Sequence, residues 1–213
     1  MMQLHYFPGN ASMTPHMLLE ELGVPYERVL VDRTKNAQNS PEYLKLNPNG
    51  KIPVLVDGDL VLYETAAIVL HLVDTHPQAG LAPAVGTTDR AVFYKWLLWL
   101  ADTLQAEMPL YFYSDRWADD AGGAAQVKRH AEAHIAGMID QLEGELARHG
   151  GPWFLGERYS ALDPYVLMLC RWTRGMTRPA RTLPALGPYL QRMLARPAVQ
   201  RAYANEGLGD PLV

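Results

Sequence analysis

Residues Leu46 to Ile68 read Leu-Asn-Pro-Asn-Gly-Lys-Ile-Pro-Val-Leu-Val-Asp-Gly-Asp-Leu-Val-Leu-Tyr-Glu-Thr-Ala-Ala-Ile. Turn-forming residues open the stretch, and Pro53 then marks the start of a strand, because proline cannot donate to the centre of a ladder. Asp57-Gly58 between two apolar runs is typical of a β-hairpin. The stretch therefore predicts a turn, two antiparallel strands and the start of a helix.

The residues before this stretch predict two further strands and two helices. The expected elements are a strand at 3–7, a helix from Ser12 or Thr14 to Gly23, a strand at 26–31 and a short helix at 41–46. The first two strands are joined by a helix, which favours a right-handed parallel unit. The complete order, β-α-β-α-β-β-α, predicts a thioredoxin-like domain.

The character of the sequence changes after residue 76. Prolines and glycines punctuate a segment without periodicity, which is typical of a linker. Beyond it, apolar residues recur at helical spacing, as in Phe93, Trp96, Leu97 and Leu100. We therefore predict an N-terminal domain at 1–77, a linker at 78–87 and an all-helical domain at 88–213, which gives an α+β domain followed by an α domain.

Composition and charge exclude several functions. The net charge is −4 without any basic run, which disfavours nucleic-acid binding. No apolar stretch is long enough to span a bilayer, and the N-terminus lacks the pattern of a signal peptide. Cys170 is the only cysteine, so an intramolecular disulfide and a C-x-x-C redox site are both excluded. These features predict a cytoplasmic protein that binds no membrane.

The order Lys51-Ile52-Pro53, strand, hairpin, strand and Glu64-Thr65 resembles the glutathione-binding half of the cytosolic glutathione transferases. The resemblance implies that glutathione is the co-substrate, that Pro53 follows a cis bond, and that the Ile52 backbone binds the cysteinyl part. It also implies that Glu64 and Thr65 bind the γ-glutamyl end. Lys51 is a candidate for the glycyl carboxylate, although a solvated lysine is the simpler interpretation.

A second stretch extends this resemblance into the helical half. Ser160 is followed three residues later by Asp163, which imitates a capping box. The transferases carry a similar sequence before a buried helix of their second domain. We assign these two residues a structural role only.

The segment from Tyr6 to His16 looks most like that of bacterial Beta-class transferases, which carry a Pro-Gly-Ala-Cys-Ser-Leu-Ala-Pro-His pattern. The cysteine of that class falls on Ala11, so its cysteine chemistry is missing. A hydroxyl or N–H group must then stabilise the glutathione thiolate. We favour Ser12, with Asn10 and Tyr6 as alternatives; a plain helix cap is the competing role for Ser12.

The electrophile pocket is expected in the helical domain. Beta-class members often have His-Lys near the position of Gln105-Ala106, so the pocket of this chain must differ from theirs. Gln105 and the aromatic residues that follow it could line the pocket: Tyr111, Phe112, Tyr113 and Trp117. A helix core is the commoner role for aromatic residues at this spacing. His130 and His134 lack an evident third ligand, so no metal is expected.

The resemblance predicts a homodimeric glutathione transferase that conjugates glutathione to small hydrophobic electrophiles. One alternative is a glutathione-binding or protein-interaction module of the same fold without turnover. Another keeps glutathione chemistry but changes the reaction to isomerisation, dehalogenation or peroxide reduction. The sequence does not separate these reactions, because the electrophile pocket comes from the variable helical half.

Overall fold

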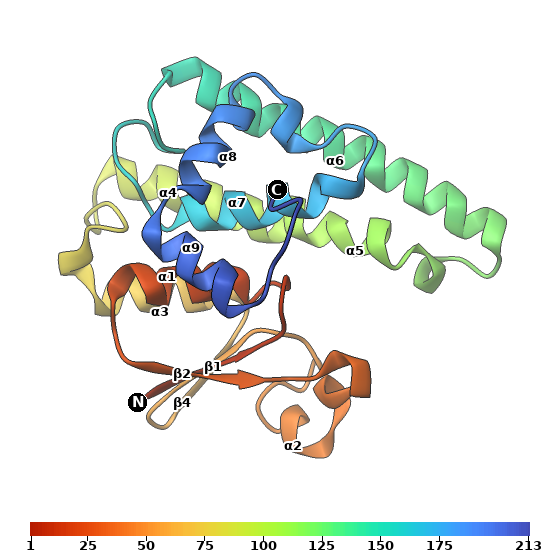
Figure 1. Cartoon of the computed structure of the whole chain (residues 1–213), viewed down its shortest axis with the longest axis horizontal. Helices are drawn as coiled ribbons and strands as arrows, with labels where there is room; N and C mark the ends of the chain where they lie inside the picture. Colours follow the sequence, from red (N-terminus) through yellow and green to blue (C-terminus); the bar gives the residue numbers. More distant parts are fainter. The chain divides into compact units, whose positions relative to one another are not determined.

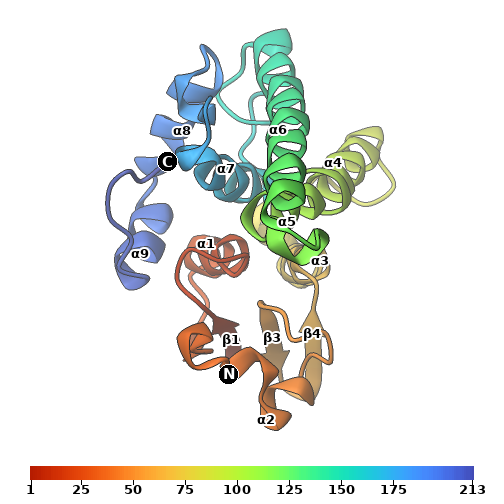
Figure 2. The same cartoon turned by 90° about the vertical axis from the view of Figure 1, so that its right-hand side faces the viewer.

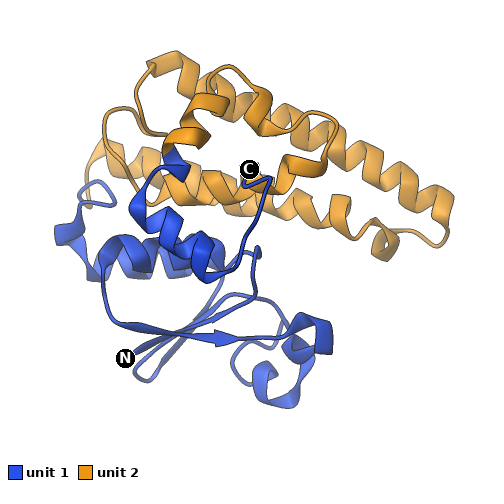
Figure 3. Ribbon diagram, in the orientation of Figure 1, with its two compact units in different colours: residues 1–84, 193–212 blue, residues 85–192, 213 orange.

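The computed structural model describes all 213 residues and divides them into two compact units. Unit 1 contains Met1–Ala84 together with Met193–Leu212, and unit 2 contains Val85–Arg192 with Val213 (Figure 3). The sequence places all residues after 88 in one helical domain. The return of residues 193–212 to the first unit is a feature that the sequence does not predict.

Unit 1 has the predicted thioredoxin-like order (Figure 1). Its strands are β1 (Met2–Tyr6), β2 (Tyr26–Leu30), β3 (Val54–Asp57) and β4 (Leu60–Tyr63). Its helices are α1 (Met13–Leu22), α2 (Pro41–Leu44), α3 (Thr65–Thr75) and α9 (Pro197–Asn205). The fold class predicted from the sequence is thereby confirmed for this unit.

The four strands form one mixed sheet in the order β2-β1-β3-β4. β1 and β2 are parallel, whereas β3 pairs antiparallel with both β1 and β4. Helices α1 and α3 cover one face of the sheet, and α2 lies on the other side (Figure 2). The core of this unit is made of fully buried aliphatic side chains from the sheet and these helices, which are Leu4, Leu18, Val54, Leu55, Ile68 and Leu72.

Turn chemistry explains where these elements end. Gly23 adopts the left-handed conformation (φ 64°) and donates its N–H to the Leu19 carbonyl, which stops α1. Gly58, in the β3–β4 hairpin, also has a positive φ of 59°. Both positions favour glycine because other residues are strained there.

Helix α9 packs against α1 through charged pairs, and Figure 1 shows the two side by side. The Arg196 guanidinium donates to both carboxylate oxygens of Glu21 at 2.6 and 2.8 Å. Arg201 donates to the Glu20 carboxylate at 2.6 Å. This contact is the physical reason why residues 193–212 join unit 1.

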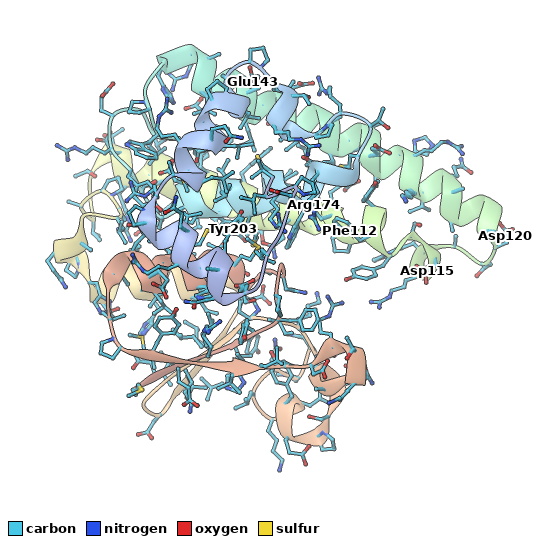
Figure 4. The ribbon with its side chains drawn as sticks, viewed as in Figure 1. Phe112, Asp115, Asp120, Glu143, Arg174 and Tyr203 are labelled. Carbon is cyan, nitrogen blue, oxygen red and sulfur yellow. The ribbon has the colours of Figure 1, made fainter.

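Unit 2 is helical. Its helices are α4 (Thr88–Trp99), α5 (Ala106–Phe112), α6 (Ala121–His149), α7 (Leu162–Trp172) and α8 (Leu186–Leu194), the last ending beyond the unit's boundary. A π-helical segment, η4 (Leu100–Gln105), joins α4 to α5. The Asp120 carboxylate caps α6 by accepting from the Gly123 N–H at 2.7 Å (Figure 4). No helix of the chain combines the length and the apolarity that crossing a membrane requires.

Half of the predicted capping box is present at the start of α7: Asp163 accepts the Ser160 N–H, but the helix has Ala161 at its N-cap and the Ser160 hydroxyl accepts the Leu162 N–H instead of that of Asp163. The Asp163 carboxylate accepts the backbone N–H groups of Ser160 at 2.7 Å and Phe154 at 2.8 Å, and the Tyr189 hydroxyl at 3.0 Å. The side chain is completely buried, and this burial raises the pKa of Asp163 to about 6 despite the surrounding donors.

Candidate functional site

The strand registers of unit 1 bring three sequence segments to one edge of the sheet. His5 pairs with Val54, and Val54 pairs with Tyr63. The end of β1, the start of β3 and the end of β4 therefore meet at this edge. Helices α1 and α3 both begin shortly after it, so their positively polarised N-termini lie near the same edge.

A tight turn leads from β1 to α1. The Asn10 N–H donates to the Phe7 carbonyl at 3.1 Å, with Pro8 and Gly9 between them. Gly9 has a φ of 70°, which together with the proline before it is typical of a type II turn. The Gly9 N–H donates to the Glu206 carboxylate at 2.8 Å, so a residue from the far end of the chain fixes this turn.

The Asn10 side chain presents hydrogen-bond donors at this turn. Its Oδ1 accepts the Ala11 N–H at 2.7 Å, which requires the oxygen to face the backbone. The Nδ2 group has no partner within the chain, and the residue is half-buried. Asn10 therefore offers N–H donors to a ligand without breaking any existing interaction.

Ser12 is placed differently from what a thiolate donor requires. It precedes α1 but makes no side-chain cap bond. Its hydroxyl donates to the Phe7 carbonyl at 3.2 Å and accepts the Phe7 N–H at 3.3 Å. The residue has no exposed surface. Its single hydroxyl hydrogen is used inside the turn, so Ser12 is better suited to holding the turn than to contacting a ligand.

Tyr6, the third predicted donor, belongs to the packing of β1 against its neighbours. The Arg28 guanidinium lies 5.3 Å from the centre of the Tyr6 ring, and the His16 ring lies 6.3 Å away. These contacts place the ring between β2 and α1.

The Ile52–Pro53 peptide bond is cis, which confirms the prediction from the resemblance. Ile52 is nearly buried, yet its backbone N–H and carbonyl make no hydrogen bond within the chain, because the ladder of β3 begins at Val54. Buried backbone groups are rarely left unpaired. Lys51 is exposed and forms no ion pair.

Glu64 and Thr65 form the start of α3. Glu64 has a φ of 72° and a ψ of 118°, an unusual conformation for a residue other than glycine. Such outliers cluster at ligand-binding sites. Thr65 is buried, and its hydroxyl has no hydrogen-bond partner in the chain. The helix start therefore combines free N–H groups with a free hydroxyl, as a carboxylate ligand requires.

In unit 2, Gln105 ends the π-helical segment. The Tyr165 hydroxyl donates to its Oε1 atom. Pro109 lies four residues further on inside α5 and has no N–H, so the Gln105 carbonyl lacks its α-helical donor. Short π-helical segments are often found at functional sites.

The predicted aromatic residues of the electrophile pocket have different surroundings. The Tyr111 hydroxyl donates to the Gly175 carbonyl at 3.4 Å. Burial, and next the Glu132 carboxylate, raise the pKa of Tyr111. The Arg116 guanidinium lies 4.4 Å from the centre of the Tyr113 ring.

Phe112 is the most exposed of the three consecutive aromatic residues in this segment, with 46% of its surface accessible (Figure 4). Its ring stands perpendicular to that of Trp172 at 6.4 Å. An exposed phenyl ring beside an indole ring is suited to contact with an apolar ligand.

Three residues that support the site were not predicted from the sequence. Glu206 lies too far along the chain for any local pattern to reveal its bond to Gly9. Tyr43 and Asn47 both donate to the Lys51 carbonyl, but the sequence indicates only a helix and a turn at these positions. The asparagine within the turn was the one available signal, since asparagine side chains bond to nearby backbone groups.

Comparison with known proteins agrees with this geometry. The family described as glutathione S-transferase, N-terminal domain, matches residues 2–74. The chain is 29% identical to glutathione S-transferase GST-4.5 of Xanthomonas campestris, over 97% of this chain and all of the relative. It is 32% identical to glutathione S-transferase 3 of Zea mays, over 91% of this chain and 89% of that protein.

A solved structure, a glutathione transferase homolog from Sulfitobacter with bound glutathione, is similar with a TM-score of 0.89 and 30% identity. The similarity covers 98% of this chain and 99% of that one. The chain therefore belongs to the glutathione S-transferase family.

Proposed function

We propose that the protein is an enzyme that transfers the glutathione thiolate to small hydrophobic electrophiles. The observation that carries the proposal is the meeting of three unused hydrogen-bonding groups at one edge of the sheet. They are the Asn10 amide, the Ile52 backbone and the Thr65 hydroxyl. Asn10 follows β1, Ile52 precedes β3 and Thr65 follows β4, and the strand registers bring these three strand ends together. Each corresponds to a different part of glutathione.

The reaction requires glutathione as a thiolate, and the pKa of the thiol determines how much free energy the site must supply to stabilise the anion. A thiol with a pKa near 8.5 is only ~3% ionised at pH 7. A decrease of ~2 pKa units raises this fraction to roughly three-quarters and requires ~2.7 kcal/mol of preferential stabilisation of the anion. One hydrogen bond to a charged acceptor contributes ~1.5–3 kcal/mol. A single well-placed donor is therefore sufficient.

Asn10 meets this requirement better than Ser12, and unlike Tyr6, which is the last residue of β1, it lies in the turn that leads into α1. Its Nδ2 donors are free, whereas the Ser12 hydroxyl donates to the Phe7 carbonyl. The positive potential at the N-terminus of α1 adds to the stabilisation. Because an amide is no base, the thiol proton leaves to water.

The other groups bind the ends of glutathione. Thr65 and the N–H groups at the start of α3 take the γ-glutamyl carboxylate, and Glu64 faces its ammonium. The Ile52 backbone binds the cysteinyl part, and the Lys51 ammonium screens the glycyl carboxylate. These assignments use the free groups found at each position.

The electrophile is bound by unit 2. Gln105, Tyr111 and Tyr113 remain the proposed lining residues, and the exposure of Phe112 adds it to them. These side chains are mostly aromatic and uncharged, which favours small hydrophobic electrophiles.

We also propose a cytoplasmic homodimer. Apolar side chains are exposed on α4, with Val92 at 37% and Leu98 at 53%, and on β4, with Leu60 and Val61 near 40%. Exposed apolar patches often mark protein interfaces. The cytoplasm supplies glutathione in its reduced form. Light scattering at micromolar concentration that gave the mass of a single chain would exclude the dimer.

Two measurements test the proposed function. Calorimetry measures glutathione binding, and turnover assays with aryl halides, enoates and organic peroxides measure the reaction class. Binding with turnover of the aryl halides or enoates supports the transferase. Binding without turnover indicates the glutathione-binding module, and turnover of peroxides alone indicates a reductase.

A further inference from the structure

We infer that Tyr43 and Asn47 are positioning residues, which together hold the Lys51 carbonyl and thereby aim the Ile52 N–H at the cysteinyl part of glutathione. The inference rests on the proposed function, because it concerns the same binding site. Neither residue needs to touch the ligand.

The two side chains converge on one oxygen atom. The Tyr43 hydroxyl and the Asn47 Nδ2 group each donate to the Lys51 carbonyl at 2.8 Å. A carbonyl oxygen has two lone pairs, so both are used. Tyr43 is 5% exposed and Asn47 only 2%. Solvent therefore does not readily replace either donor.

Each donor is itself fixed. The Tyr43 ring belongs to an apolar cluster with Val31, Ile52 and Val54. The Asn47 Oδ1 atom accepts the Asn49 N–H at 3.0 Å, so the amide is held from both ends. The Asn47 N–H also donates to the Tyr43 carbonyl at 3.0 Å, which links the two donors through the backbone.

We call the two hydrogen bonds from Tyr43 and Asn47 to the Lys51 carbonyl the clamp. Because the peptide unit is planar, the clamp also determines the direction of the Ile52 N–H. The Lys51 carbonyl and the Ile52 N–H belong to one rigid peptide unit and point in opposite directions. Fixing the oxygen with two donors therefore fixes the N–H as well. Since the Ile52 N–H has no partner in the chain, it stays available for a ligand carbonyl.

Two substitutions remove one donor each with little change of shape. Tyr43→Phe removes the hydroxyl and keeps the ring in its cluster. Asn47→Asp keeps the oxygen that accepts from Asn49 but replaces the donor to the Lys51 carbonyl. Tyr189→Phe is the matched control, because it also removes a buried hydroxyl bond but lies in unit 2.

The experiment measures three quantities in wild type and the variants: KM for glutathione with kcat, thermal unfolding, and hydrogen exchange of the Ile52 amide with and without glutathione. Each clamp variant is expected to raise KM roughly 5-fold, the effect of one lost hydrogen bond, with kcat within about twofold. Glutathione should protect the Ile52 amide from exchange in wild type and protect it less in both variants. Tyr189→Phe should lower the unfolding temperature without changing KM or this protection.

The outcomes separate this inference from the proposed function. Clamp variants that unfold earlier but keep the wild-type KM and the same protection of Ile52 would show that Tyr43 and Asn47 are merely structural. Wild-type protein that neither binds glutathione nor protects the Ile52 amide would overturn the glutathione site itself, and this inference with it.

Discussion

The Nδ1 atom of His16 lies 2.7 Å from Oε1 of Glu206, 190 residues later in the chain, and both side chains are buried almost completely. The second oxygen of the same carboxylate accepts the Gly9 N–H. One side chain thus joins the body of α1 to the turn before it. That turn carries Asn10, so the C-terminal segment contributes to the geometry of the site.

Glu206→Ala should destabilise the fold, because it removes the carboxylate that bonds to both His16 and the Gly9 N–H. The loss of these two bonds, one from a buried side chain and one from a half-buried backbone group, costs about 2–5 kcal/mol in the free energy of unfolding. Glu206→Gln is the control, since its amide oxygen can still accept from one of them and should cost less. Denaturant unfolding measures both. A loss below about 1 kcal/mol for the alanine variant would contradict this role.

Asp163 should make stability depend on pH. Burial raises the pKa of this carboxyl to about 6 in the folded state, above the unfolded value of 3.8. Its contribution is therefore fully present below pH 3.8 and is lost as the pH rises through about 6. The stability of wild type relative to Asp163→Asn should fall by about 3 kcal/mol across this window. Equal pH profiles for the two proteins would contradict the shift.

Thr65→Ala should weaken glutathione binding by about 1–3 kcal/mol, because the γ-glutamyl carboxylate loses a hydroxyl donor. Thr65→Ser retains the hydroxyl and should bind like wild type. Calorimetry with both variants distinguishes the hydroxyl from the methyl group. Unchanged affinity in the alanine variant would remove Thr65 from the site.

Phe112→Ala tests the electrophile pocket. The side chain is 46% exposed, so its loss should change the free energy of unfolding by less than about 1 kcal/mol. The KM for an aryl halide should rise severalfold while the KM for glutathione stays the same. If the KM for the aryl halide is also unchanged, Phe112 lies outside the pocket.

Local signals explain the parts of the fold that the sequence predicts. Asp57-Gly58 predicts the hairpin, and Gly23 predicts the end of the first helix, because both depend on backbone conformations that few residues adopt. The family resemblance adds the cis bond before Pro53, which no local signal would fix.

The sequence does not predict long-range contacts or the direction in which a side chain points. Nothing near Arg196 in the sequence indicates that its partner is Glu21 on the first helix. Likewise, a serine before a helix predicts a cap or a ligand contact equally well. Only the structure shows that the Ser12 hydroxyl donates backwards to Phe7, whereas the Asn10 side chain accepts through its Oδ1 and keeps its Nδ2 donors unused.

The pKa of the glutathione thiol bound to the enzyme, read from thiolate absorbance during a pH titration, shows directly whether Asn10 stabilises the thiolate. In wild type, we expect a value about 2 units below that of free glutathione. Asn10→Ala should raise this pKa by about 1–2 units, and Ser12→Ala should change it less. A bound thiol that titrates like free glutathione in wild type would show that the site does not stabilise the thiolate, and identical titration in wild type and Asn10→Ala would show that Asn10 is not the donor.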